Sequence, residues 1–366
     1  MDIEKSNRII SIIVASIQTT LVIAVALLCA RFFLEADKRK QFFPYISQWH
    51  LEAGKLELKT KTYPPPPLFM PKPKSQPEKD IHHDDVAQDY LAPPLTFLPP
   101  KPEPLKGSPI RFEKKSVDGI PLYLATVSLK DPETFITLAL PHDAKEANSA
   151  QKTYGVETFN SFVARLNAAL VQNGTFFSKD EEKRVMGNMV ANGRWLKYSQ
   201  WENYGTTFGL RKGNIPEMIT ARVDGKPDWK EHWFSLTCGP RLVKNGQVEI
   251  RAEDEGFADP HVLGGGSRCA LGYPASKDKV FLVTFLRGLT LNREAKVMKA
   301  IGCVEAMNLD GGASRSVAHS KNIVVPASRP LTNVIVVYDT NHPAPPAVKN
   351  SWRSFQRNRA MIQLIR

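Results

Sequence analysis

CVEAMNLDGGAS, residues 303–314, is a short apolar run that ends in an acid and two adjacent glycines. An apolar run of this length predicts a strand buried on both faces, and the carboxyl end of such a strand often carries functional side chains. The glycine pair lets the backbone turn sharply and bring its N–H groups close to an anion. We therefore predict a site for a charged, sugar-like ligand at Asp310, although Asp-Gly-Gly is equally a plain turn signal.

The residues around this run predict strand, helix and strand in succession. Residues 280–285 are typical of a buried strand, and Asn292 is placed to cap a helix that Gly302 ends. Further upstream, strand-like runs at 122–127 and 134–140 precede a predicted helix that begins at Glu157. Its apolar residues recur at helical spacing: Phe159, Phe162, Val163, Leu166 and Leu170. Residues 334–338 predict a last strand, and the neighbouring run 329–333 is expected to border the same cleft as Asp310.

Composition excludes some classes of function. The chain has 366 residues, 42% of them hydrophobic, and a net charge of +12. Its basic residues are scattered and form no stripe with interleaved aromatics, so we predict no nucleic-acid partner, whereas an anionic lipid or polymer fits the charge equally well. None of the four cysteines forms a CxxC pair, which argues against a zinc or redox motif. Cys238 and Cys269 either pair outside the cytosol or remain buried thiols.

An uncharged, mostly apolar segment runs from residue 9 to residue 30, after a short N-terminal tail of residues 1–8. As a helix it would span roughly 30 Å of hydrocarbon, which is enough to cross a bilayer. The segment is longer than the apolar region of a cleaved signal peptide, so it predicts an uncleaved transmembrane signal anchor. The positive-inside rule alone would keep the following residues in the cytoplasm, but a large following domain can override that bias.

Three segments follow the anchor. Residues 31–109 comprise a juxtamembrane segment and a linker that holds about half of the chain's prolines, a composition that favours an extended polyproline stalk. Residues 110–339 predict the globular domain. Residues 340–366 form a basic tail, which is predicted to lie on an anionic membrane surface, to remain flexible or to pack on the domain.

Four ordered motifs lie within the predicted domain. They are NGTFF at 173–177, GPRLV at 239–243, RCALG at 268–272 and NLDGGAS at 308–314. Their order and separations resemble those of the phosphodiester glycosidase family over residues 110–339. The chain departs from the family pattern at Cys269, Ala313 and Thr175, changes that keep the arginine and the acid and are expected to narrow substrate choice.

The resemblance implies both a fold and an activity. The implied fold class is α+β, a mixed twisted β-sheet with flanking helices whose motif loops meet in one pocket. The implied activity is hydrolysis of a sugar-1-phosphodiester, such as a GlcNAc-1-phosphodiester, in an envelope or exported glycan. Bacterial members of the family often carry a label of exopolysaccharide biosynthesis or export. The chain is thus expected to be a single-pass membrane protein with an extracytoplasmic enzyme domain, periplasmic or lumenal.

Phosphate is a good leaving group, so one acid is sufficient where ordinary glycosidases use two. We predict Asp310 as base or nucleophile at the anomeric carbon and Arg268 as the group that neutralises the departing phosphate. In a second mechanism, an acetamido group of the substrate is the nucleophile and Asp310 orients it. The residues predicted to bind sugar and anion are Asn173, Gly174, Gly239, Asn308, Gly311, Gly312 and Ser314.

Two questions stay open at the level of sequence. No cofactor or metal site is indicated, although the acidic residues of 253–259 would supply a second carboxylate or hold a divalent cation if they are not simply solvated. The predicted partners are a phosphorylated glycan and, through residues 9–30, the membrane. The alternative functions are a noncatalytic binder of phosphorylated glycans or a scaffold in exopolysaccharide assembly.

Overall fold

The computed structural model describes residues 106–200 and 202–364. The predicted anchor at 9–30, the N-terminal tail and almost all of the proline-rich linker lie outside these residues. Within the described part of the chain, no helix is both long enough and apolar enough to cross a membrane.

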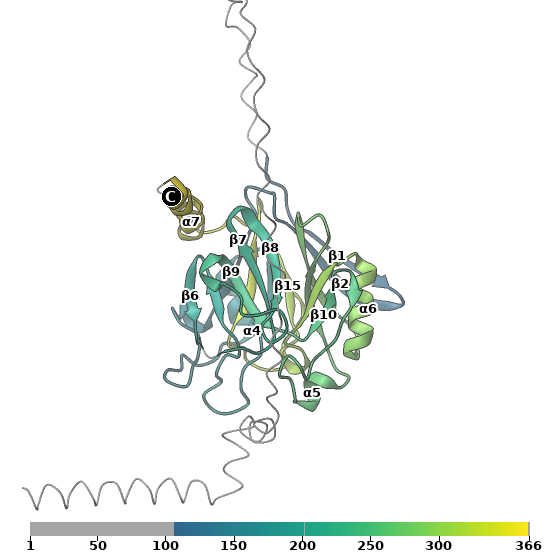
Figure 1. Cartoon of the computed structure of the whole chain (residues 1–366). Coiled ribbons are helices and arrows are strands. Elements are labelled where there is room, and N and C mark those ends of the chain that lie inside the picture. The colour runs from purple at the N-terminus through teal and green to yellow at the C-terminus, as the bar shows by residue number, and fades with distance from the viewer. Residues whose placement is uncertain (1–105, 201, 365–366) are drawn as a thin grey trace, which may run out of the picture. The chain divides into compact units, whose positions relative to one another are not determined.

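The largest sheet has seven strands in the order β1-β2-β13-β12-β14-β10-β11, and all of its pairings are antiparallel. Helix α6 lies along one face of it (Figure 1), where Ala295 and Met298 pack among Leu124, Val283 and Ala306 in a buried apolar cluster. The elements are β1 (Arg111–Val117), β2 (Ile120–Ser128), β10 (Arg241–Lys244), β11 (Gln247–Val248), β12 (Cys269–Tyr273), β13 (Lys279–Phe285), α6 (Leu291–Ile301) and β14 (Glu305–Leu309).

Two five-stranded sheets lie against the other face, in the orders β16-β15-β4-β17-β3 and β6-β5-β9-β7-β8. One apolar cluster joins all three sheets. Met307 belongs to it from the seven-stranded sheet, and Ile335 and Phe234 from the two five-stranded sheets in the order given. The strands are β3 (Phe135–Ala139), β4 (Leu170–Asn173), β5 (Met189–Ala191), β6 (Arg194–Lys197), β7 (Thr206–Arg211), β8 (Ile215–Thr220), β9 (His232–Cys238), β15 (Val317–His319), β16 (Asn322–Val325) and β17 (Val334–Tyr338).

The α+β class is confirmed, but the predicted single mixed sheet differs from the structure. The described residues form three sheets, and every pairing between their named strands is antiparallel. Antiparallel strands need no helical crossover, so few helices are required to connect them. Besides α6 these are α4 (Phe159–Leu166), α5 (Pro260–Leu263) and α7 (Pro346–Leu364), with short 3-10 turns at Pro141–Asp143, Lys212–Asn214, Trp229–Glu231 and Gly312–Ser314.

Two helix boundaries differ from the sequence prediction. Thr290, and not Asn292, caps α6, because its side chain accepts a hydrogen bond from the Arg293 N–H, while Gly302 ends the helix in the left-handed region as expected. The predicted helical stripe is right as far as Leu166. Asn167 then adopts a left-handed conformation, and Leu170 begins β4.

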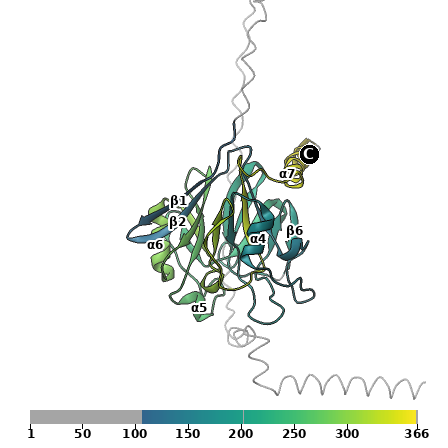
Figure 2. The ribbon, with the colours of Figure 1, turned by 180° about the vertical axis from the view of Figure 1, so that it is seen from behind.

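The two ends of the domain carry different features. In both views, α5 lies at the lower end and α7 at the upper end (Figures 1 and 2). The described chain also begins near α7, because Gly107 contacts Glu133 and Lys349 of α7 forms an ion pair with the same glutamate. Trp352 packs edge-on against Trp233 with ring centroids 5.2 Å apart, so the first half of the predicted basic tail packs on the domain.

Candidate functional site

The candidate site lies where β14 ends. The backbone N–H of Asp310 donates to the carbonyl of Gly174 at 3.2 Å, and Nδ2 of Asn173 donates to the carbonyl of Asp310 at 2.5 Å. Oδ1 of Asn173 accepts a hydrogen bond from the Ser316 N–H at 2.9 Å. The first and fourth motifs therefore meet at the ends of β4 and β14, and Asn173 holds both ends of the backbone loop from Asp310 to Ser316.

The carboxylate of Asp310 faces an arginine that lies 19 residues further along the chain. Nη2 of Arg329 donates to Oδ2 of Asp310 at 3.1 Å, and Nε of Arg329 donates to the hydroxyl of Ser314 at 2.7 Å. The guanidinium also lies over the ring of Phe177, 4.2 Å from its centroid, so an aromatic face helps to orient it. Arg329 was predicted only as part of a run, 329–333, that borders the cleft.

Burial dominates the electrostatics of Asp310. It raises the pKa of this carboxyl above its ordinary value, because the charged form loses hydration, while hydrogen bonds from Ser314, Arg329 and the Gly311 N–H oppose the rise. The side chain is only 8% exposed. Asp310 is therefore a carboxylate that takes up a proton more readily than an exposed aspartate, as a general base must.

A cavity of about 670 Å³ opens in front of Asp310. Of the predicted site residues, Asp310, Arg268, Gly311 and Gly312 line it. Its walls combine apolar and charged side chains, among them Phe176, Phe177, Met186, Tyr204, Phe257, Lys179, Asp259, His261 and Arg329. A mostly apolar cavity with a few convergent polar groups is typical of a small-molecule site.

Arg268 binds groups of the protein itself, which the sequence did not indicate. Its guanidinium donates to the carbonyl of Val262 at 2.8 Å and to that of Gly264, and Nε lies 3.8 Å from the carboxylate of Glu294. Burial lowers the pKa of Arg268, and it raises the pKa of Glu294 to about 8. Arg268 thus braces the loop that forms one wall of the cavity.

The remaining predicted residues lie behind the cavity wall. Nδ2 of Asn308 donates to the carbonyl of Gly239 at 2.9 Å, so the second and fourth motifs are joined directly. Among the described residues, Oδ1 of Asn308 has no hydrogen-bond partner. Gly174 packs against the side chain of Asn333. The contacts described here position the Asp310 loop, and direct binding of sugar by Asn173, Gly174, Gly239, Asn308 and Ser314 stays a prediction.

Position 311 requires glycine because the backbone of Ser267 lies very close to it. A Cβ at this position would lie 2.1 Å from the carbonyl oxygen of Ser267, which belongs to the backbone and cannot rotate away. We expect Gly311→Ala to lower the free energy of unfolding by about 1–3 kcal/mol, the usual cost of overpacking. Gly265→Ala is the control, since a Cβ there meets nothing within 4 Å. Urea unfolding of both variants tests this, and equal stability would contradict the role of Gly311.

The acidic residues of 253–259 differ in their exposure to solvent. Glu253 and Asp254 are exposed, Glu255 is buried, and Asp259 lines the cavity mouth. There Asp259 lies 3.1 Å from Nζ of Lys179, and hydrogen bonds from the backbone and ring of His261 lower its pKa to about 2. Within residues 106–200 and 202–364, no group of three or more His, Cys, Asp or Glu side chains is arranged to hold a metal ion.

Glu255 predicts a pH dependence of stability. Burial raises its pKa from 4.5 to about 7, although the Thr206 hydroxyl and the Arg241 N–H donate to it. Between about pH 4.5 and 7 the unfolded chain therefore releases this proton while the folded one retains it, and stability falls as pH rises. At about 1.4 kcal/mol per pKa unit the loss is on the order of 3 kcal/mol.

Glu255→Gln should remove this loss. Relative to the parent, we expect the variant to gain about 2–3 kcal/mol between pH 5 and pH 8, measured by urea unfolding at both values. The control is Glu253→Gln, because Glu253 is exposed. If the difference in unfolding free energy between the parent and Glu255→Gln is the same at pH 5 and pH 8, the pH dependence does not come from Glu255.

The cysteines are resolved in favour of thiols. Cys238, Cys269 and Cys303 are free and buried. Burial raises the pKa of Cys238 and of Cys269 to about 12, so neither thiol is a nucleophile near neutral pH.

The buried carboxylate of Asp310, paired with Arg329, thus lies in a cavity beside the backbone of Gly311 and Gly312. Residues 166–338, which contain this site, match the model of the phosphodiester glycosidase family. The resemblance seen in the four motifs is thereby confirmed, and this part of the chain is a phosphodiester glycosidase-like domain. No curated protein sequence matches the chain significantly.

Two solved structures resemble the chain in part. One is a hypothetical protein from Synechocystis, with 15% identity and a TM-score of 0.48, which covers 62% of this chain. The chain spans 61% of that protein's length. The other is the catalytic domain of zebrafish N-acetylglucosamine-1-phosphodiester alpha-N-acetylglucosaminidase, auto-inhibited by its pro-peptide. It has 17% identity and a TM-score of 0.48, and the match covers 64% of this chain and 83% of that one.

Proposed function

We propose that the domain hydrolyses a sugar-1-phosphodiester, with a GlcNAc-1-phosphodiester as the model substrate. The observation that carries the proposal is the buried Asp310 carboxylate, 3.1 Å from Arg329, at the wall of a cavity of about 670 Å³. A cavity of that size falls within the range of small-molecule sites. The family match over residues 166–338 supports the same reaction class.

The proposed reaction needs one base and one cation. Asp310 takes a proton from water as the water oxygen forms a bond to the anomeric carbon. The bond from that carbon to the phosphate oxygen breaks, and its electron pair leaves with the phosphate, giving a free sugar and a phosphate monoester. Because phosphate leaves readily, no strong general acid is required. In the alternative route an acetamido group of the substrate attacks first, and Asp310 orients it.

Arg329 is the first candidate for the phosphate partner, and Arg268 is the second. Both line the cavity. Arg329 is 33% exposed and touches Asp310 directly, whereas Arg268 is 4% exposed and donates to three backbone carbonyls. A planar guanidinium suits a phosphate because it donates two parallel hydrogen bonds. If the Arg329 guanidinium shifts its hydrogen bond from Asp310 to the phosphate of the substrate, the Asp310 carboxylate also becomes free to act as base.

The proposed setting is outside the cytoplasm, on an envelope or exported glycan, with the chain anchored by residues 9–30. The described chain begins beside α7, at the end of the domain opposite α5 (Figures 1 and 2). His261 and Val262 of α5 line the cavity. Protease treatment of spheroplasts, whose outer membrane has been opened, tests the setting: digestion of the domain is expected, and protection until the cytoplasmic membrane is lysed would contradict it.

Turnover by the purified full chain tests the proposed activity. The probe is the methyl diester of GlcNAc-1-phosphate, and the products measured are free GlcNAc and methyl phosphate. Hydrolysis that is lost in Asp310→Ala supports the proposal. Binding of the probe without turnover in both proteins would instead favour the noncatalytic glycan binder.

A further inference from the structure

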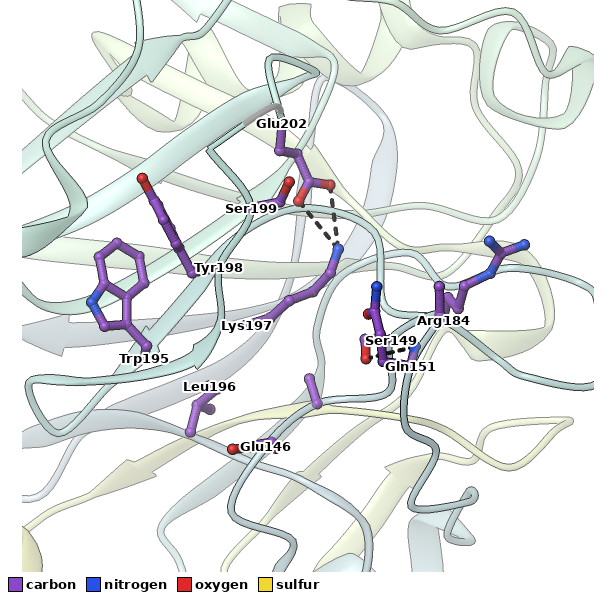
Figure 3. Close-up of a pocket in the computed structure, with 12 residues that line it drawn as sticks. Glu146, Ser149, Gln151, Arg184, Trp195, Leu196, Lys197, Tyr198, Ser199 and Glu202 are labelled. Atoms are coloured by element: carbon purple, nitrogen blue, oxygen red, sulfur yellow. Dashed lines mark hydrogen bonds and ion pairs between the residues drawn. The ribbon is translucent and has the colours of Figure 1, made fainter. Parts of the chain in front are cut away.

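A second cavity, of about 640 Å³, is lined by residues of 146–151, 184 and 195–202 (Figure 3). Two segments separate the two cavities. Arg184 lines the second cavity and Met186 the first, and Glu202 lines the second and Tyr204 the first. The Cα atoms of residues two apart in a chain are at most about 7 Å apart, so the two cavities are neighbours that share a wall built from these two segments.

The walls of the second cavity are tied together by hydrogen bonds. Asn148, itself buried, donates through Nδ2 to the carbonyls of Gly155 and Lys183, and its own carbonyl accepts from the Val185 N–H. On the other side, the carboxylate of Glu202 accepts from the Gly187 N–H at 2.7 Å. The cavity is thus a preorganised site, which lowers the entropic cost of binding.

The side chains in this cavity suit a sugar ring. Trp195 and Tyr198 place their ring centroids 4.4 Å apart at one edge, and Tyr198 is 53% exposed. Beside them Nζ of Lys197 lies 3.2 Å from the carboxylate of Glu202, and Figure 3 shows these two side chains pointing toward each other. Ser149, Gln151 and Glu146 add further polar side chains to the lining.

A ligand for this lining must offer a flat apolar face and many hydroxyl groups. Sugar rings have both, since their C–H faces pack on aromatic rings and their hydroxyls donate to and accept from charged side chains. Basic and acidic groups are mixed here, whereas a phosphate site would gather cations. We infer that the second cavity is a glycan subsite, which binds neutral sugar units of the substrate beyond the scissile phosphate. This inference rests on the proposed function.

Two substrates with the same reacting bond test the subsite. The short one is the methyl diester of GlcNAc-1-phosphate, and the long one is the same phosphate esterified to the 6-hydroxyl of mannotetraose. For the full chain, we expect Tyr198→Ala to raise KM for the long substrate about tenfold, with kcat and the short substrate unchanged. Tyr198→Phe keeps the aromatic face and should restore KM. Ile215→Ala is the control, because Ile215 is 55% exposed on β8, outside the lining of both cavities.

The outcomes separate this inference from the proposed function. Equal KM values of parent and Tyr198→Ala on the long substrate, with turnover intact, would overturn the subsite and leave the activity standing. Calorimetry with free mannotetraose provides a second arm that requires no turnover. Binding that Tyr198→Ala abolishes supports the subsite even if neither diester is hydrolysed, in which case only the proposed function fails. Absence of binding together with an unchanged KM overturns the subsite.

Discussion

Replacing Asp310 by asparagine is expected to lower kcat/KM for a GlcNAc-1-phosphodiester by about 1,000-fold, the range that general-base catalysis supplies. Asparagine keeps the shape of the side chain but cannot take a proton from water. The measurement is release of free sugar by the purified full chain under conditions of excess substrate. Asp254→Asn is the matched control, because Asp254 is exposed and lies outside the lining of the cavity.

The same variant should be more stable than the parent at neutral pH. Burial raises the pKa of Asp310, so the folded state loses stability as pH rises from the unfolded value through the folded one. An uncharged asparagine escapes this loss. Reduced activity together with increased stability is the expected signature of a catalytic carboxylate. Full activity of the Asp310→Asn variant would show that Asp310 is not the general base.

Replacing Arg329 by glutamine is expected to lower kcat/KM by about 100-fold, the usual cost of losing one group that stabilises developing charge. It should also change the pH dependence. Arg329 lowers the pKa of Asp310 through its charge and its hydrogen bond, so its removal raises that pKa. The acidic limb of kcat/KM, where the base must be deprotonated, then moves to higher pH.

Two comparisons make the Arg329 result specific. Arg287→Gln is the control, since Arg287 is exposed and lies outside the cavity. Arg268→Gln should differ in kind, because it leaves the buried Glu294 without its cation and removes donors from the carbonyls of Val262 and Gly264. Its expected effect is loss of stability. If Arg268→Gln keeps full stability and loses activity while Arg329→Gln keeps activity, the phosphate partner is Arg268.

The sequence was informative where one segment fixes its own environment. The run that ends at Leu309 is apolar on both faces, and β14 is buried there as predicted, with Asp310 at its end. Gly311 and Gly312 also line the cavity as expected. Helix boundaries were less certain, because Thr290 and Asn292 are both good caps and only the tertiary path of the chain selects one.

The sequence was less informative where function depends on residues that are distant in the chain. Arg329 stood in a run expected to border the cleft, but nothing local indicates that its guanidinium reaches Asp310 and Ser314. The side-chain amides of Asn173 and Asn308 are of a type that often binds sugar hydroxyls. In the structure, however, they donate hydrogen bonds to the backbone carbonyls of Asp310 and Gly239 at the ends of strands. An amide group in a loop motif serves either purpose, and burial decides which groups are free to meet a ligand.

The order of the motifs, the strand before Asp310 and the glycines after it were determined by the sequence alone, because backbone conformation and apolar periodicity are local properties. Only the tertiary structure decided which cation meets the acid, how strongly burial raises the pKa of Asp310, and that a second cavity with Tyr198 lies beside the first. The physical reason is that electrostatics and cavity shape depend on distances between side chains, and folding sets these by bringing remote segments together.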